Sequence, residues 1–301
     1  MNDNRKAQLL NDDFSNISCI TNGAALYQMK NCCPTQMMGY LIRTAEGRLI
    51  AIDGGNREDT ETFLNLARSV SACREGEKPR IDAWFLTHVH SDHVGVFMET
   101  IANYRNRVDI GAVYYNFPSV EYQDKYESIY AYTSHEFHEI EPLFSDIAVK
   151  VHAGESYSFG TAVFDIMTEP DESITVNTGN NTSVAIMVKI EGQRVFFLGD
   201  MGIEEGEAML RRYQPEDLRA DFVEMAHHGQ NGVTFEVYRT ISPKACLWCA
   251  PDWLWRNDAG DGYGTGPWKT LVTRCWMQDL GLKHHFIEKD GIWEIPLPYK
   301  F

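Results

Sequence analysis

Short apolar runs, each bounded by polar residues or glycine, recur along most of the chain. Four of them span residues 49–52, 81–86, 184–190 and 194–198. Apolar runs of this length between turn signals are typical of strands that are buried in a sheet. The pattern therefore predicts several buried strands rather than a chain built from helices alone.

Segments with helical periodicity alternate with these strands. Apolar residues three or four positions apart predict helices over residues 57–73, 203–213 and 267–280, the last with proline at an allowed first-turn position. The predicted apolar face of the last helix consists of Trp268, Leu271, Val272, Cys275, Trp276 and Leu280. Alternating strands and helices predict an α/β protein.

An aromatic-rich insertion near residues 116–146 also has helical spacing. Its stripe consists of Tyr122, Tyr126, Ile129, Thr133, Phe137 and Ile140. Such stripes usually mark a face packed against the core, and the alternative is an aromatic wall beside a substrate cleft. Since no linker divides the chain, we expect a single domain over residues 1–301 that contains this helical insertion.

The most specific pattern in the chain is residues 87–93, Thr-His-Val-His-Ser-Asp-His, which follows an apolar run. Four metal-binding side chains, His88, His90, Asp92 and His93, therefore lie within six residues at the end of a predicted strand. Imidazole and carboxylate ligands suit zinc, manganese or iron, and two such ions about 3.5–4 Å apart can act together in hydrolysis. The spacing predicts a metal site rather than a histidine-rich polar turn.

This pattern resembles the signature of the metallo-β-lactamase superfamily, and three further segments occur in the order found in that family. Residues 49–55 resemble its early strand ending in Asp-Gly-Gly, residues 195–200 its strand ending in an aspartate, and residues 222–229 its strand before the last histidine. The resemblance covers nearly the whole chain. It implies an αββα sandwich of two mixed β-sheets flanked by helices, with the active site along the edge between the sheets.

The resemblance also implies two divalent metal ions, with zinc favoured and manganese or iron as alternatives. His88 and His90 would bind the first metal, and Asp92 and His93 would bind the second. Asp200 would bridge both, which suits a carboxylate with two oxygens. A hydroxide held between the metals would then be the nucleophile.

By the same resemblance, either of the adjacent histidines His227 and His228 could complete the second metal site, and we favour His228. His227 would then face the substrate as a catalytic proton donor, or it would only cap the strand and orient its neighbour. Asp92 is the other candidate catalytic residue, beside its role as a ligand. Asp53 is expected to hold the ligand loop by hydrogen bonds rather than to bind metal.

One part of the family pattern is missing. The usual third histidine of the first metal should lie within residues 168–183, and no histidine occurs there. The sequence Asn-Asn-x-Ser at 180–183, together with His-His-Gly at 227–229, resembles the branch that contains the hydrolase domain of competence proteins. The first site would have fewer protein ligands, or it would recruit Asp171 or an asparagine oxygen. The nearest histidine, His152, precedes the expected position by a strand.

The composition of the chain limits its possible binding partners and its cellular location. The net charge of −16 opposes stable binding of nucleic acid, whereas bound metals would still attract a small anionic substrate. The sequence has no long apolar run and no apolar leader, so we expect neither a membrane span nor secretion. Seven scattered cysteines favour reduced thiols and a cytoplasmic location.

Three classes of function remain. The branch resemblance favours a metal-dependent phosphodiesterase or another phosphoester hydrolase. The alternative is a lactonase, thioesterase or β-lactamase-like hydrolase of a carboxylic ester or amide, although such relatives usually keep the missing histidine. The second alternative is a non-enzymatic metal-binding module, which the retained ligand set disfavours.

Overall fold

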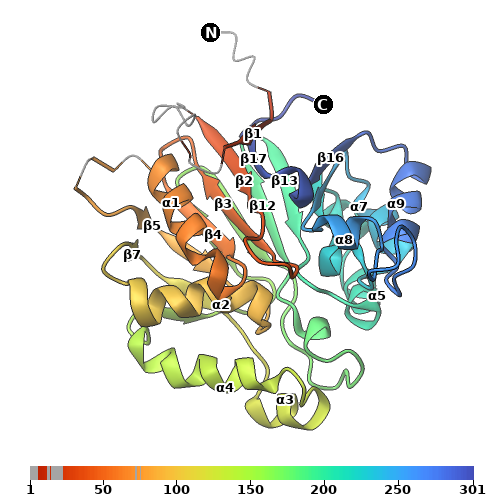
Figure 1. The fold of residues 1–301 in the computed structure, drawn as a ribbon, viewed down its shortest axis with the longest axis horizontal. Helices are drawn as coiled ribbons and strands as arrows, with labels where there is room; N and C mark the ends of the chain where they lie inside the picture. Colours follow the sequence, from red (N-terminus) through yellow and green to blue (C-terminus); the bar gives the residue numbers. More distant parts are fainter. Residues whose placement is uncertain (1–5, 12–13, 15–22, 72, 75) are drawn as a thin grey trace.

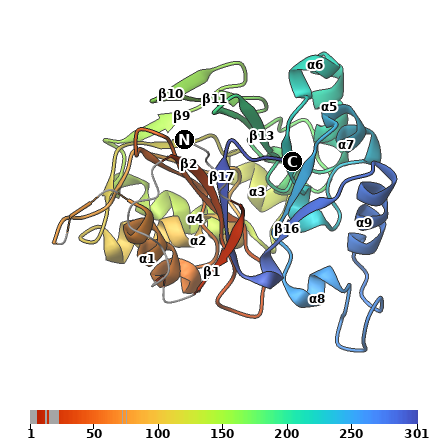
Figure 2. The same ribbon diagram turned by 90° about the horizontal axis from the view of Figure 1, so that it is seen from above.

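The structure, a computed structural model, describes residues 6–11, 14, 23–71, 73–74 and 76–301. Two β-sheets face each other at its centre, and helices cover the outer face of each sheet (Figure 1). Figure 2 shows the same layers from a direction turned by 90°. The predicted αββα sandwich is therefore confirmed.

The first sheet mixes antiparallel and parallel strands. From one edge to the other, its strands are β1 (Gln8–Leu10), β17 (Ile292–Leu297), β2 (Ala24–Gln28), β3 (Gly39–Arg43), β4 (Leu49–Asp53), β6 (Ala83–Phe85), β8 (Val113–Tyr115) and β9 (Ala148–Lys150). Neighbouring strands from β1 to β4 pair antiparallel. The pairs from β4 to β9 are parallel, so the polypeptide leaves these strands at the same edge.

The second sheet is also mixed. Its strands, in spatial order, are β10 (Ser156–Phe159), β11 (Ala162–Ile166), β12 (Ile186–Ile190), β13 (Gln193–Phe197), β14 (Phe222–Glu224), β15 (Ala245–Trp248) and β16 (His284–Ile287). The pairs from β10 to β13 are antiparallel, and those from β13 to β16 are parallel. A separate two-stranded pair joins β5 (Arg80–Ile81) to β7 (Asp109–Ile110).

Two groups of helices form the outer layers. The first sheet is covered by η1 (Arg57–Asp59), α1 (Thr60–Val70), α2 (Ser91–Glu99), η2 (Thr100–Tyr104) and α4 (Ala131–Ile140), with α3 (Val120–Tyr126) and η3 (Glu141–Leu143) beside them. The second sheet is covered by α5 (Ile203–Arg212), α6 (Pro215–Leu218), α7 (Phe235–Ile241), α8 (Asp252–Trp255) and α9 (Thr270–Asp279). The short turns η4 (Asn180–Thr182), η5 (Ala226–Gly229) and η6 (Glu288–Asp290) complete the fold. No helix in the described part of the chain is long and apolar enough to cross a membrane.

The strands are apolar on both faces because each face meets a different layer. Along β4, Leu49 and Ala51 pack toward the helices, whereas Ile50 and Ile52 pack between the two sheets. This alternation follows from the two-residue period of a strand. A strand that is covered on both faces has a continuous apolar run as its sequence, and this is the pattern found here.

The expected apolar face of the last long helix is confirmed only in part, because Trp268, Trp276 and Leu280 are partly buried and pack against the core. Val272 and Cys275 are exposed in α9, and its buried residues are Thr270, Thr273 and Met277. The Thr273 hydroxyl donates to the Lys269 carbonyl, so this polar side chain is buried with its donor satisfied. Such a local hydrogen bond is invisible to an analysis of apolar spacing alone.

Helices also occupy the expected insertion between β8 and β9. Tyr122, Thr133 and Phe137 of the predicted stripe are buried, whereas Tyr126 and Ile129 are exposed. The stripe therefore packs against the core only in part, because residues 127–130 form a turn between α3 and α4 rather than a continuous helix. That the chain is a single domain stays a prediction.

Aromatic packing between the sheets is expected to contribute strongly to stability. The Phe164 ring is fully buried and stacks on Phe85, with ring centroids 5.0 Å apart. Phe164→Ala should lower the free energy of unfolding by about 3–5 kcal/mol, because it leaves a cavity between two sheets. Ile129→Ala, at a side chain that is 78% exposed, should change it by less than about 0.5 kcal/mol. Urea-induced unfolding measures both, and similar losses in the two variants would contradict the expected packing.

Candidate metal centre

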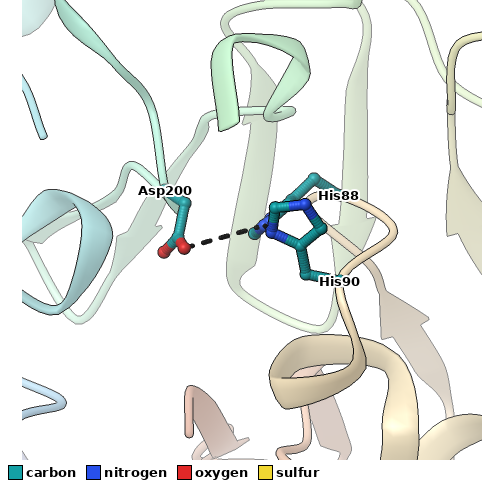
Figure 3. Close-up of side chains that lie close together, drawn as sticks. All are labelled: His88, His90 and Asp200. Atoms are coloured by element: carbon teal, nitrogen blue, oxygen red, sulfur yellow. Dashed lines mark hydrogen bonds and ion pairs between the residues drawn. The ribbon is translucent and has the colours of Figure 1, made fainter. Parts of the chain in front are cut away.

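The metal-binding motif lies where strands of both sheets end at one edge of the sandwich. His88 and His90 follow β6, in the loop that leads into α2. Asp200 follows β13, and residues 227–228 follow β14 in the second sheet. Figure 3 shows the side chains of His88, His90 and Asp200 pointing toward one another from their two loops.

The first group of possible ligands consists of His88, His90 and Asp200, whose ligand atoms lie within 4.8 Å of one another. His88 Nε2 is 3.0 Å from His90 Nδ1 and 3.7 Å from Asp200 Oδ2. Two atoms bound to one zinc ion at about 2.0–2.2 Å can be no more than roughly 4.4 Å apart. The distances in this group therefore suit a single metal ion.

The second group consists of Asp92, His93 and His228. His228 Nε2 lies 3.3 Å from Asp92 Oδ2, and both His93 and His228 are fully buried. Asp92 and His93 belong to the first turn of α2, so the start of one helix supplies two of the three side chains. This group also suits one metal ion.

Asp200 lies between the two groups and turns a different oxygen toward each. Its Oδ1 is 3.2 Å from His93 Nε2 and 3.6 Å from His228 Nε2, whereas its Oδ2 faces His88. A carboxylate that bridges two metals needs this arrangement. The structure thus brings together all six predicted metal ligands, and their binding of metal stays a prediction.

Several buried polar atoms of the centre have no hydrogen-bond partner among the described residues. They are His93 Nε2, His228 Nε2 and Asp200 Oδ1, which converge on one another. Buried polar atoms are nearly always paired, and unpaired nitrogen and oxygen lone pairs that converge on one point are suited to bind a cation. The residues present therefore fit divalent metal ions.

Hydrogen bonds behind the ligands fix which nitrogen each histidine presents. His93 Nδ1 donates to Asp53 Oδ2 over 2.7 Å, and His228 Nδ1 donates to the Cys249 carbonyl over 2.9 Å. Both Nε2 atoms are thereby left as lone-pair donors to metal. Asp53 also accepts from the amide and the hydroxyl of Thr87, which confirms the expectation that it holds the ligand loop.

The electrostatics of the centre keep its carboxylates anionic. Burial alone would raise the pKa of Asp200, but the His93 and His228 imidazoles hold it well below its usual range. Burial would likewise raise the pKa of Asp92, and the hydrogen bond and charge of its histidine neighbours lower it. Burial lowers the pKa of His88 well below its usual value, so this imidazole is neutral. Anionic carboxylates and neutral imidazoles are the forms that bind metals. Burial would lower the pKa of His93, but Asp200 and Asp53 raise it well above its usual value, so a metal ion would displace a proton from this ring.

Glu127 belongs to the centre, although the sequence analysis did not identify it. Its Oε1 accepts a hydrogen bond from His90 Nε2 at 3.1 Å, which leaves His90 Nδ1 facing His88. Gly179 makes this approach possible, because a side chain there would overlap the Glu127 carboxylate and the His90 ring. Glu127 lies 37 residues from His90 in the turn before α4, so no local spacing could have pointed to it.

A second missed residue, Glu224, positions the loop that carries Asp200. It is fully buried at the end of β14, and its Oε2 accepts from the amides of Leu198 and Gly199 at 2.9 and 2.7 Å. Burial, reinforced by the negative charge of Asp53, raises the pKa of Glu224 to about 8. A glutamate inside an otherwise apolar strand was the signal available in the sequence.

The segment without a histidine meets the centre through Asn180. Asn180 Nδ2 is 3.5 Å from His227 Nε2, and Asn180 Oδ1 is buried with no partner in the described part of the chain. Asp171 and His152 belong to neither ligand group, and they line a separate cavity of about 620 Å³. His152 is half-exposed and pairs with Glu169 instead. Of the replacements considered from sequence, the structure places only an asparagine at the centre.

The two adjacent histidines lie on different sides of Asp200. His228 faces the second group, as favoured from the sequence, whereas His227 Nε2 lies 3.7 Å from Asp200 Oδ2. The His227 side chain is 16% exposed. Its action as a proton donor stays a prediction.

Comparison with known proteins gives a family and a fold. The sequence model of the metallo-beta-lactamase superfamily matches residues 38–243, which is more than half of the chain. A search of the curated proteins gave no match. Neither finding concerns the competence-protein branch, which stays a prediction.

Solved structures with the same fold include two that match most of this chain. The metallo-beta-lactamase fold protein YhfI from Bacillus subtilis is 11% identical, with a TM-score of 0.51, over 90% of this chain and 99% of that one. CmlA, a diiron beta-hydroxylase from Streptomyces venezuelae, is 15% identical, with a TM-score of 0.51, over 92% of this chain and 55% of that one. At these identities the likeness concerns the fold alone.

Removing the shared carboxylate should weaken both metal sites. Wild-type protein should retain two metal ions per chain after dialysis, and Asp200→Ala should lose affinity at both by more than the roughly 10–100-fold that is typical of outer hydrogen-bond partners. Metal content measured by mass spectrometry tests this, with Asp261→Ala at an exposed loop residue as the matched control. Full occupancy in Asp200→Ala would contradict the bridging position.

Removing the charge of Glu127 should affect the first site alone. Glu127→Gln keeps the shape of the side chain but loses the charge-assisted hydrogen bond to His90, so one of the two metals should bind about tenfold more weakly. A competition titration with a chromophoric chelator measures both affinities. Glu121→Gln makes the same change at an exposed position of α3 and should have no effect. Equal weakening of both metals would show general disruption rather than positioning of His90.

Proposed function

The chain belongs to the metallo-beta-lactamase superfamily, and from this premise we propose that it is a metal-dependent hydrolase of phosphodiester bonds in a small substrate. One observation carries the proposal: the two oxygens of Asp200 face two separate groups of ligands. Two divalent cations bound there would lower the pKa of a water molecule and polarise the bond to be cleaved. Imidazoles outnumber carboxylates in both groups together, which favours zinc over manganese or iron.

The charge of the centre supports an anionic substrate. The ligand carboxylates are Asp92 and Asp200, and Asp53 and Glu127 are hydrogen-bonded behind the histidines, so the positive charge of two divalent cations would be concentrated at the metals themselves, where a substrate would bind. A phosphodiester carries its negative charge on the two non-bridging oxygens of the phosphorus atom that is attacked. It therefore gains more from this charge than a neutral lactone or thioester does.

Asp92 is suited to orient the attacking water. Its Oδ2 accepts a hydrogen bond from Gln36 Nε2 at 3.0 Å, and Gln230 Nε2 donates in turn to Gln36 Oε1 at 2.9 Å. This chain of amides links the start of α2 to the loop after η5 and fixes the carboxylate in place. Because the pKa of Asp92 is lowered, the carboxylate stays anionic and accepts a proton in a hydrogen bond rather than donating one.

A reducing, cytoplasmic location accompanies this proposal. Its support is that all six cysteines in the described residues are free thiols. The proposed substrate is a small molecule rather than nucleic acid, because a polyanion would meet a protein with a net charge of −16.

A panel of chromogenic substrates tests the proposal. With zinc and, separately, manganese, bis-p-nitrophenyl phosphate should be hydrolysed with a kcat/KM at least tenfold above that of a chromogenic lactone or β-lactam. Asp92→Ala should reduce this rate by about 10²-fold or more, and Asp261→Ala should not change it.

The alternatives correspond to distinct outcomes of the same panel. Tenfold preference for the lactone or β-lactam would assign the chain to hydrolysis of carboxylic esters or amides. Two bound metals without turnover of any substrate would indicate a metal-binding module.

A further inference from the structure

The two ligand groups are unequal in the number of side chains that they contain. Asp200 Oδ1 adds a fourth donor to the second group, whereas the first group has only His88, His90 and Asp200 Oδ2. Catalytic zinc sites hold three or four side chains and a water molecule, and zinc can expand to five ligands, so the first group has room for one more side chain beside a water molecule. The question is which nearby side chain can reach that position.

His227 is placed to fill it. Its Nε2 lies 3.7 Å from Asp200 Oδ2, the same oxygen that lies 3.7 Å from His88 Nε2. Both distances are below the roughly 4.4 Å limit for two atoms on one zinc ion. His227 is not within 4.8 Å of every other ligand atom of the first group, so its ring has to rotate toward His88 and His90 when the metal binds. His227 Nδ1 is buried and has no hydrogen-bond partner among the residues described, and Nε2 has one long contact, with Asn180 Nδ2 at 3.5 Å, that a metal ion would replace.

The backbone explains how two consecutive histidines reach one centre. Neighbouring residues of an extended strand point to opposite faces, so a strand could present only one of them. His227 and His228 instead have φ angles of 52° and 57°, in the left-handed region that non-glycine residues seldom adopt. Such strain is typical of functional sites. The His227 amide also donates to the Gly199 carbonyl at 3.0 Å, which ties this turn to the loop of Asp200.

The residue after the two histidines, Gly229, fixes the conformation of this turn. Gly229 has a φ of 79°, and a side chain there would overlap the buried Trp248 ring. Only glycine fits, so the chain reverses directly after the two histidines. The conformation that turns both rings toward Asp200 is therefore built into the packing.

We propose that His227 Nε2 is the fourth protein ligand of the first metal, so that two consecutive histidines serve one metal each. This inference rests on the proposed metal-dependent function. It assigns His227 a different role from the proton donor expected from the sequence. Asn180 is the rival donor, because its Oδ1 is also buried without a partner and its amide lies beside His227.

Metal counting in combined variants tests the proposal without measuring turnover. Full-length protein is stripped with a chelator, reloaded with zinc and dialysed, and its metal content is measured. Wild type should hold two zinc ions, and His227→Ala and Asp92→Ala should each hold one. The double variant should hold none, because the two substitutions remove ligands of different metals. Asn180→Ala, which removes the rival donor, should keep two, and so should the exposed control Asp261→Ala.

A second variant separates loss of a ligand from loss of folding. His227→Gly relieves the left-handed strain, so it should unfold at the wild-type temperature or above and still lose the first metal. Cobalt reports the same change through its absorption spectrum, because the absorption of one of the two ions should disappear.

The remaining outcomes overturn either the ligand role of His227 or the proposed metal-dependent function, and the measurements distinguish the two cases. Two tightly bound zinc ions in His227→Ala would overturn the ligand role, and a rate loss confined to substrates with poor leaving groups would then restore the proton donor. Loss of the first metal in Asn180→Ala, with retention in His227→Ala, would assign the position to the asparagine oxygen. Wild-type protein that binds no metal would instead overturn the proposed function itself.

Discussion

The buried carboxylate of Asp200 is the group on which the rest of the centre depends. Its side chain is 1% exposed, and an ion of this kind that is buried without partners costs several kcal/mol. Imidazoles from both sheets therefore converge on it, and two cations between them would complete its neutralisation. Its position is fixed from behind, because its amide donates to Ser183 Oγ at 3.1 Å and Glu224 binds the preceding loop. The charge cannot move away from the histidines that it faces.

The sandwich supplies the rigidity that such a centre needs. Each ligand loop begins at a strand whose side chains are buried on both faces, so the loop ends are held by the hydrophobic core. Asp53 at the end of β4 joins the loop of Thr87 to His93, and it connects neighbouring strands of one sheet through charged hydrogen bonds. Ligands held in this way need little rearrangement when a metal binds. Stability of the fold and geometry of the centre therefore have a common source.

The sequence predicted the parts of the structure that depend on residues close to one another in the chain. Four ligands within residues 87–93 and the apolar strands around them need only short-range spacing, and the sandwich followed from their order. Glu127 could not be predicted, because it reaches His90 through the packing of a distant turn. The buried face of α9 was predicted only in part for a related reason: Thr273 is satisfied by a hydrogen bond that apolar periodicity ignores. The orientation of His227 depends on a left-handed backbone, which a strand pattern does not reveal.

On the proposed function, two length scales of electrostatics would allow an acidic protein to select an anionic substrate. At physiological salt, charges more than about 8–10 Å apart are largely screened from one another. A small phosphodiester at the centre would lie within this distance of both cations, so the local positive charge dominates its binding. A nucleic acid would extend far beyond it and place further phosphates against a chain with a net charge of −16. The same charge distribution thus favours a compact anion and disfavours a polymer built from the same chemical bond.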